Sequence, residues 1–122
     1  MAQLSHAKPG VIVYSGSWTG GATPTIVAGA GSFTVSFDTD LYTVTLLGPE
    51  PIATKMVICL SVEDTAMTGA SDAFILNVKD TTPQTGVFTV QAREVSGTVD
   101  QLEDAAVVHF VVYAHVATDS VA

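Results

Sequence analysis

The 122-residue sequence contains a single cysteine, Cys59, so no disulfide can form within the chain. Cys59 lies in an apolar run from residue 56 to residue 60, which predicts an inert thiol in the core. A chain of this length can bury enough surface to fold as one domain without a metal or a disulfide. We therefore expect one domain and no structural cofactor.

Basic residues are scarce, because four lysines and arginines stand against twelve acidic residues and leave a net charge of -8. Such a charge repels phosphate backbones and anionic lipid headgroups, so neither nucleic acid nor a membrane is an expected partner. Charged residues make up only 13% of the chain, against roughly 25% in an ordinary soluble domain. A surface so poor in charge is better explained if an assembly covers part of it, which favours a homo-oligomer.

Targeting signals are also lacking. The N-terminus has no charged region followed by an apolar region, as a signal peptide would. No apolar run approaches the length of about twenty residues that a membrane span requires. We expect a soluble protein that is made in a cytoplasm.

No recognised catalytic motif occurs: a G-x-S-x-G elbow, a glycine-rich phosphate loop and zinc-ligand spacing are all missing. His109 and His115 would lie about 20 Å apart along one strand, too far to bind one metal ion, and His6 falls in an N-terminal arm. Asp38 and Asp40 are too few ligands for calcium and are explained by a turn. We predict no enzyme activity, no metal and no cofactor.

The most informative stretch is 106–116, in which valine and aromatic residues predict a β-strand. Alternate residues of a strand point to opposite faces, and here both faces carry apolar side chains. The stretch is therefore expected to be a central strand, covered on both sides. Residues 55–62 show the same pattern and are the second candidate for a central position.

The remaining chain predicts further short strands at a spacing of about ten residues, with turn signals between them. The clearest hairpin joins 32–37 to 42–47, with Phe33, Val35 and Phe37 on the same face as Tyr42, Val44 and Leu46. No convincing helical period is present. We predict an all-β fold, an antiparallel, jelly-roll-like β-sandwich of seven to eight strands.

The expected boundaries are an extended arm over 1–9, a single sandwich over 10–117 and a short tail over 118–122. Trp18 falls in a glycine-rich loop, 15–24, and is interpreted as a lid over the core or a contact with a partner. Leu4 and His6 in the arm are further candidate partner contacts. One face of the 106–116 strand is the candidate oligomer interface: Val107, His109, Val111, Tyr113 and His115.

Two interpretations of these histidines stay open. Copies of His109 or His115 that converge on a symmetry axis would make assembly depend on pH. A solvent-facing or hydrogen-bonded histidine without a role in assembly is the simpler alternative.

The hairpin 31–45 and the closing stretch 108–114 resemble small β-sandwich structural proteins of tailed bacteriophages, namely capsid decoration (cement) proteins and fibre-tip domains. The resemblance lies in the spacing of strands and turns and in the composition, over about 11–116. It implies a homotrimer on the surface of the virion whose partner is the major capsid protein. Since the chain begins at Met1 with a nine-residue arm and no shaft, a decoration protein is the preferred role. The arm would add a strand to a sheet edge of the capsid protein or of a neighbouring copy.

The alternative function is a receptor- or glycan-binding module at a fibre or spike tip. It would use Trp18, Tyr14 or the loop 63–72. Fold alone does not decide between these functions.

Overall fold

The computed structural model describes residues 5–8, 10–48, 52–64, 74–94 and 106–116. Within these ranges the chain forms β-strands and a single turn of 3-10 helix. No helix there is long and apolar enough to cross a bilayer. The elements are β1 (Ser5–Lys8), β2 (Val11–Thr19), β3 (Ile26–Ala28), β4 (Phe33–Asp38), β5 (Leu41–Leu46), β6 (Ile52–Glu63), β7 (Phe74–Thr82), η2 (Pro83–Thr85), β8 (Val87–Glu94) and β9 (Val107–Val116).

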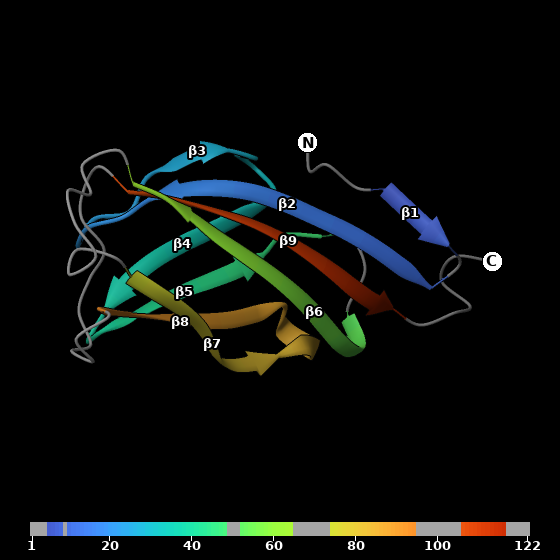
Figure 1. Ribbon diagram of the computed structural model, residues 1–122. Coiled ribbons are helices and arrows are strands. Elements are labelled where there is room, and N and C mark those ends of the chain that lie inside the picture. The colour runs from blue at the N-terminus through green and yellow to red at the C-terminus, as the bar shows by residue number, and fades with distance from the viewer. Residues whose placement is uncertain (1–4, 9, 49–51, 65–73, 95–105, 117–122) are drawn as a thin grey trace.

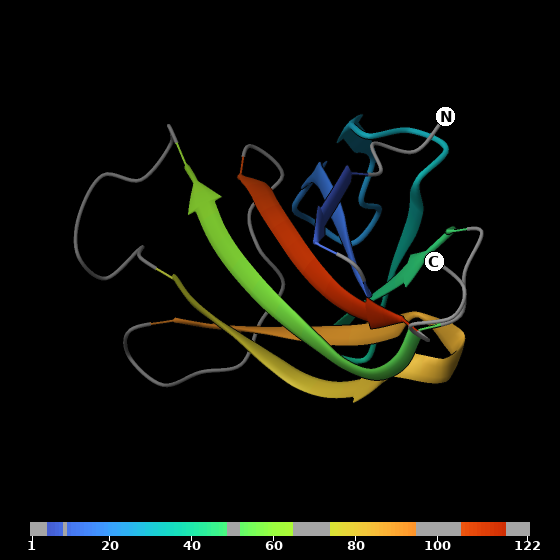
Figure 2. The same ribbon diagram turned by 90° about the vertical axis from the view of Figure 1, so that its right-hand side faces the viewer.

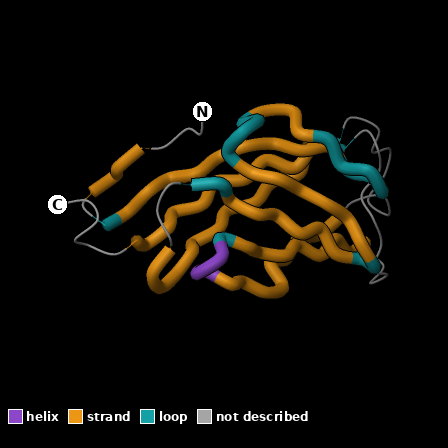
Figure 3. The backbone as a smooth tube through the Cα atoms, turned by 180° about the vertical axis from the view of Figure 1, so that it is seen from behind, coloured by secondary structure: helices purple, strands orange, loops and turns teal. Residues whose placement is uncertain are grey.

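The strands form two antiparallel sheets that face each other (Figures 1 and 2). Sheet A has the order β1-β2-β9-β6, with β3 also paired to β2, and sheet B has the order β4-β5-β8-β7. The turn η2 joins β7 to β8 within sheet B (Figure 3). This architecture confirms the predicted antiparallel β-sandwich. The described strands exceed the predicted number because Ser5–Lys8, expected to be an extended arm, adds a short strand to β2 of its own chain.

The predicted central strand, β9, lies between β2 and β6 and is paired to both along its length. The second prediction of a central strand is wrong. Among the described residues, β6 pairs only with β9 and therefore forms the edge of sheet A. Its sequence is apolar on both faces, as a central strand requires, but nothing in a sequence pattern distinguishes a strand with two neighbours from a strand with one.

The predicted hairpin is confirmed, and its register places the expected residues opposite one another. Phe33 pairs with Leu46, Val35 with Val44 and Phe37 with Tyr42. The turn between the strands has Thr39 and Asp40 at φ of 47° and 70°. Two successive left-handed residues match the twist of the flanking strands, and aspartate tolerates this conformation better than most residues.

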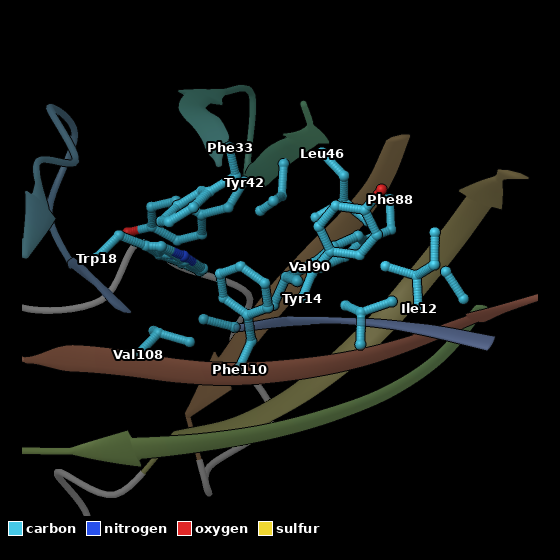
Figure 4. Packing of buried hydrophobic residues seen from close by; sticks show 14 of the residues in the cluster. Ile12, Tyr14, Trp18, Phe33, Tyr42, Leu46, Phe88, Val90, Val108 and Phe110 are labelled. Atoms are coloured by element: carbon cyan, nitrogen blue, oxygen red, sulfur yellow. The ribbon is translucent and has the colours of Figure 1, made fainter. Parts of the chain in front are cut away.

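The core lies between the sheets and is built mainly from β2, β5, β8 and β9 (Figure 4). Aromatic rings from both sheets meet there: Phe110 contacts Phe33 at a centroid distance of 4.9 Å and Phe88 at 5.9 Å. The largest side chains with almost no exposed surface are Trp18, Tyr14, Tyr42, Phe33, Phe88 and Ile12.

Trp18 corrects the prediction of a loop after residue 14. Residues 15–18 continue β2 and pair with β9 as far as Val108. The Trp18 ring is fully buried, with its centroid 5.0 Å from that of Tyr42. Glycine at position 16 has a packing role, because a Cβ there would clash with the Phe33 ring and lie 3.0 Å from the Phe110 ring. The glycine that suggested a loop instead permits close packing in a strand.

Burial is much less complete where β6 and β7 close the sandwich. The apolar residues of these strands that face the core are packed against it but remain partly exposed: Met56, Ile58, Leu60, Val62, Phe74, Leu76 and Val78. The side closed by β6 and β7 therefore presents apolar surface, although Ile26, Val35 and Phe37 on the opposite side are also only partly buried.

Candidate functional site

The outer face of sheet A, turned away from the core, is the candidate site. Its side chains form cross-strand rows because β2 and β6 flank β9 in register. Val13, Tyr113 and Val57 form one row, and Ser15, Val111 and Cys59 form the next. The following two rows are Ser17, His109 and Ser61, then Thr19, Val107 and Glu63.

Large apolar side chains on this face are exposed: Val57 to 51% and Tyr113 to 41%, while Val13, Val107 and Val111 are half-buried. The outer face of sheet B is different. Its paired rows are mostly hydroxyl and amide side chains, such as Ser36 beside Thr43 and Asn77 beside Gln91, and its large exposed apolar side chain, Ile75, is 50% exposed beside Arg93 on the edge strand β7. Hydroxyl-rich rows are an ordinary solvent-facing surface, whereas a row of valines and a tyrosine is a candidate contact surface.

A hydrogen-bonded relay crosses this face from β2 through β9 to β6. The Nδ1 atom of His109 lies 2.7 Å from the Ser17 hydroxyl, and its Nε2 atom lies 2.9 Å from a carboxylate oxygen of Glu63. An ionised carboxylate can only accept a hydrogen bond, so Nε2 carries the proton and donates. In the neutral ring Nδ1 is then the acceptor, and the Ser17 hydroxyl donates to it. The relay holds the imidazole in one orientation on the face.

The order serine, histidine, carboxylate is also that of a nucleophilic triad. Acyl transfer further requires hydrogen-bond donors aimed at the developing oxyanion. His109 lies on β9, whose backbone is paired to a strand on each side. Ser17 is only 7% exposed. What the contacts show is that the two hydrogen bonds hold the His109 ring between β2 and β6.

Two open hollows flank the His109 ring. The larger, of about 320 Å³, is bounded on the β2 side by Ser15, Gly16, Ser17, Ala28 and Gly29. The smaller, of about 180 Å³, is bounded on the β6 side by Cys59, Leu60 and Ser61. The His109 side chain therefore lies between two hollows, into which side chains of another protein could pack.

All five candidate interface residues of β9 lie on this outer face, as their spacing predicted. Val107, His109 and Val111 are half-buried, and Tyr113 and His115 are exposed. His109 has the hydrogen-bonded environment that was one of the two interpretations.

The other candidate contacts fare differently. The interpretation of Trp18 as a partner contact is wrong for this structure, because its side chain has no exposed surface. Tyr14, proposed for a glycan site, is likewise buried, with 1% exposed. Leu4 and the loop positions 65–72 lie outside the described residues, and only the backbone of His6, in β1, is described.

Sequence reasoning missed the contributions of β2 and β6 to the face. The sequence pattern places Ser17 and Glu63 in loops, and Cys59 in the core, although the Cys59 side chain is exposed on the outer face. For Cys59 and Glu63 the available signal is the alternation from residue 56 to residue 63, in which the odd positions share a face.

Within the ranges that the structure describes, no three histidine, cysteine or acidic side chains come together as a metal site would require. Comparison of the chain with protein-family models, with curated proteins and with solved structures finds no match.

Proposed function

We propose that the protein is a non-enzymatic structural protein that binds another protein surface through the outer face of sheet A. The observation that carries this proposal is the contrast between the two sheets. The outer face of sheet A presents Val57, Val111 and Tyr113 on neighbouring strands, whereas that of sheet B is lined mainly by threonine, serine and amide side chains. Contiguous apolar patches on otherwise polar proteins mark interaction sites.

More specifically, we propose a capsid decoration protein that binds the major capsid protein as a homo-oligomer and stabilises the shell. This role agrees with the low share of charged residues, 13%, since a subunit held on a shell needs fewer charges to stay apart from its neighbours. It would place the protein on the capsid surface of a virion. A trimer is the oligomer that the resemblance to phage structural proteins implies.

The alternative, a receptor- or glycan-binding module at a fibre tip, receives less support. Two of its candidate residues, Trp18 and Tyr14, are buried in the core and cannot form an aromatic platform at the surface. Such a module would require other residues.

The test is to locate the chain in purified particles whose genome encodes it, by labelled antibody and by copy number per particle. A decoration protein is found on the shell in many copies, whereas a fibre-tip module is found at tail or spike ends in few. Absence from particles would reject both roles.

The face is tested by two matched variants on central strands. Val111→Lys places a charge in the middle of the outer face of sheet A, and Thr43→Lys does so on the outer face of sheet B; both positions are half-buried. We expect Val111→Lys to weaken binding to shells by at least about tenfold and Thr43→Lys to leave it unchanged. The reverse result would contradict the proposed face.

A further inference from the structure

The unpaired edge of β6 is unusual for an edge strand. At twelve residues, β6 is the longest of the described strands, and no described strand is hydrogen-bonded to its outer edge. Proteins normally protect such edges with prolines, charges or bulges, because exposed N–H and C=O groups invite pairing with another strand. From Met56 to Val62 the strand contains no proline and no charged residue, and its ladder with β9 is regular.

Both faces of β6 also leave apolar side chains exposed. On the outer face Val57 is 51% exposed, and on the inner face Met56, Ile58, Leu60 and Val62 are only partly buried. Exposed apolar side chains on both faces are typical of a strand that pairs with a further strand. A further strand along the free edge would pair its backbone and cover both faces at once.

The two charged residues of β6 indicate which strand that neighbour is. Lys55 and Glu63 lie four residues before and four residues after Cys59. Lys55 directly precedes Met56, where the regular ladder with β9 begins after an irregularity between Ile52 and Met56. If two copies of β6 pair in antiparallel orientation with Cys59 opposite itself and the new ladder includes Lys55, then Lys55 of each copy lies opposite Glu63 of the other. Opposite charges face each other twice, through a contact that uses the same residues from both copies.

The same register also matches the inner face. Met56 lies opposite Val62 of the second copy, and Ile58 opposite Leu60, so that every inner pair is apolar. A shift by two residues in either direction places Lys55 opposite Ser61, or Glu63 opposite Val57, and loses both ion pairs. A single register therefore satisfies the charges and the apolar face together.

We propose that two copies of the chain pair through the outer edges of β6, antiparallel, with Cys59 on the twofold axis. The pairing makes β6 an interior strand of a continuous sheet that runs from β1 of one copy to β1 of the other. It also joins the two outer faces of sheet A into one larger surface. The pairing does not depend on what that surface binds, and it predicts a dimer in place of the trimer that the resemblance implies.

The first experiment measures the mass of the purified chain by size-exclusion chromatography with light scattering across a dilution series. We expect a dimer that dissociates at low concentration. Lys55→Glu replaces two attractions by two repulsions and should raise the dissociation constant by at least about tenfold. The matched control is Lys79→Glu on β7, which makes the same change of charge at another exposed strand position and should leave the dimer unchanged.

Reversing the charge at both Lys55 and Glu63 provides the decisive test. The double variant Lys55→Glu with Glu63→Lys restores opposite charges across the axis and should recover most of the lost affinity. Both changed side chains are exposed, and circular dichroism verifies that the variants fold.

Cys59 reports the register directly. Residues directly opposite in an antiparallel pair have Cβ atoms about 4.5–5.5 Å apart, so a short bifunctional thiol reagent should link two copies through Cys59. In the control, Val57→Cys with Cys59→Ser, the two thiols lie about 13 Å apart along the strands, and the yield should fall to background. A monomer at all concentrations, a dimer without rescue by the double reversal, or equal cross-linking of the control would each overturn the proposed pairing.

Discussion

β9 and β6 are neighbours in sheet A and have similar apolar sequences, but their side chains are buried to very different extents. Facing the core, Val108, Val112 and Ala114 of β9 are 0% exposed. Their partners on β6, among them Ile58 and Val62, remain partly exposed. The difference arises from position, since among the described strands β9 has a neighbour on each side and β6 has one.

The comparison shows that burial in a small sandwich depends on neighbours as much as on the residue itself. The same valine contributes fully to stability when strands cover it on both flanks and only partly when one flank is open. Apolar residues on an open flank are then available for contact with another protein. Substitutions on the two strands test this difference, with the chain kept dilute so that monomers are compared.

The largest effect is expected for large-to-small substitutions in the row that contains Phe110 and Leu60. Phe110→Ala removes a ring that is 3% exposed and contacts two other rings, and should lower the free energy of unfolding by about 3–5 kcal/mol. Leu60→Ala, in the partner residue on β6, should cost only about 1–2 kcal/mol because less surface is lost. Urea denaturation measures both, and equal losses would show that the β6 flank is sealed.

Much of this contrast could not be predicted from the sequence. The alternation and the valine-rich composition of 106–116 correctly predicted a central strand, and the hairpin 32–47 was predicted with the residues that share its inner face. The position of β6 was not predicted. Apolar residues on both faces indicate that a strand is covered, but they do not identify the strands that lie beside it. If the proposed pairing of two copies holds, the prediction of a central strand describes the dimer and fails only for the single chain.

The candidate site was half predicted. The outer five residues of β9 follow from its alternation, but the rows that they form with Ser17 and Glu63 depend on the order of strands in the sheet. The strand position of Ser17 was not predicted, because the glycines near it in the sequence indicate a loop. In the structure Gly16 is instead required by the two phenylalanine rings that pack against it.

A second pair of substitutions enlarges the residues that lie beside Phe110 on β2 and on β6. Gly16→Ala on the β2 side forces a methyl group against the Phe33 ring and should cost about 1–3 kcal/mol, even though the strand gains a better β-former. Leu60→Phe on the β6 side adds more atoms but can extend over the open flank, so we expect a change within about 0.5 kcal/mol. Thermal or urea unfolding of the two variants provides the measurement. A larger cost for Leu60→Phe than for Gly16→Ala would contradict the difference in packing.

A smaller effect is expected for the two serines that flank His109 in one row. Ser17 donates to Nδ1 of the imidazole and is 7% exposed, so Ser17→Ala should lower stability by about 1 kcal/mol. Ser61, on the β6 side of the same row, is exposed, and Ser61→Ala should change stability by no more than about 0.5 kcal/mol. If the two variants have equal stability, the hydrogen bond on the β2 side contributes nothing measurable.

The smallest effect is expected for Glu63→Gln, at the β6 end of the relay. The Glu63 and His109 side chains are 62% and 44% exposed, and an interaction between two such surface groups contributes little because water and salt screen it. Glutamine keeps an oxygen that can accept from Nε2, so the substitution removes the charge and retains the hydrogen bond. We expect a change within about 0.5 kcal/mol, with the proton of the neutral ring still on Nε2 in nitrogen-15 NMR spectra. A shift of that proton to Nδ1 would mean that the carboxylate charge, and not the geometry of the three strands, determines how His109 is held on the outer face.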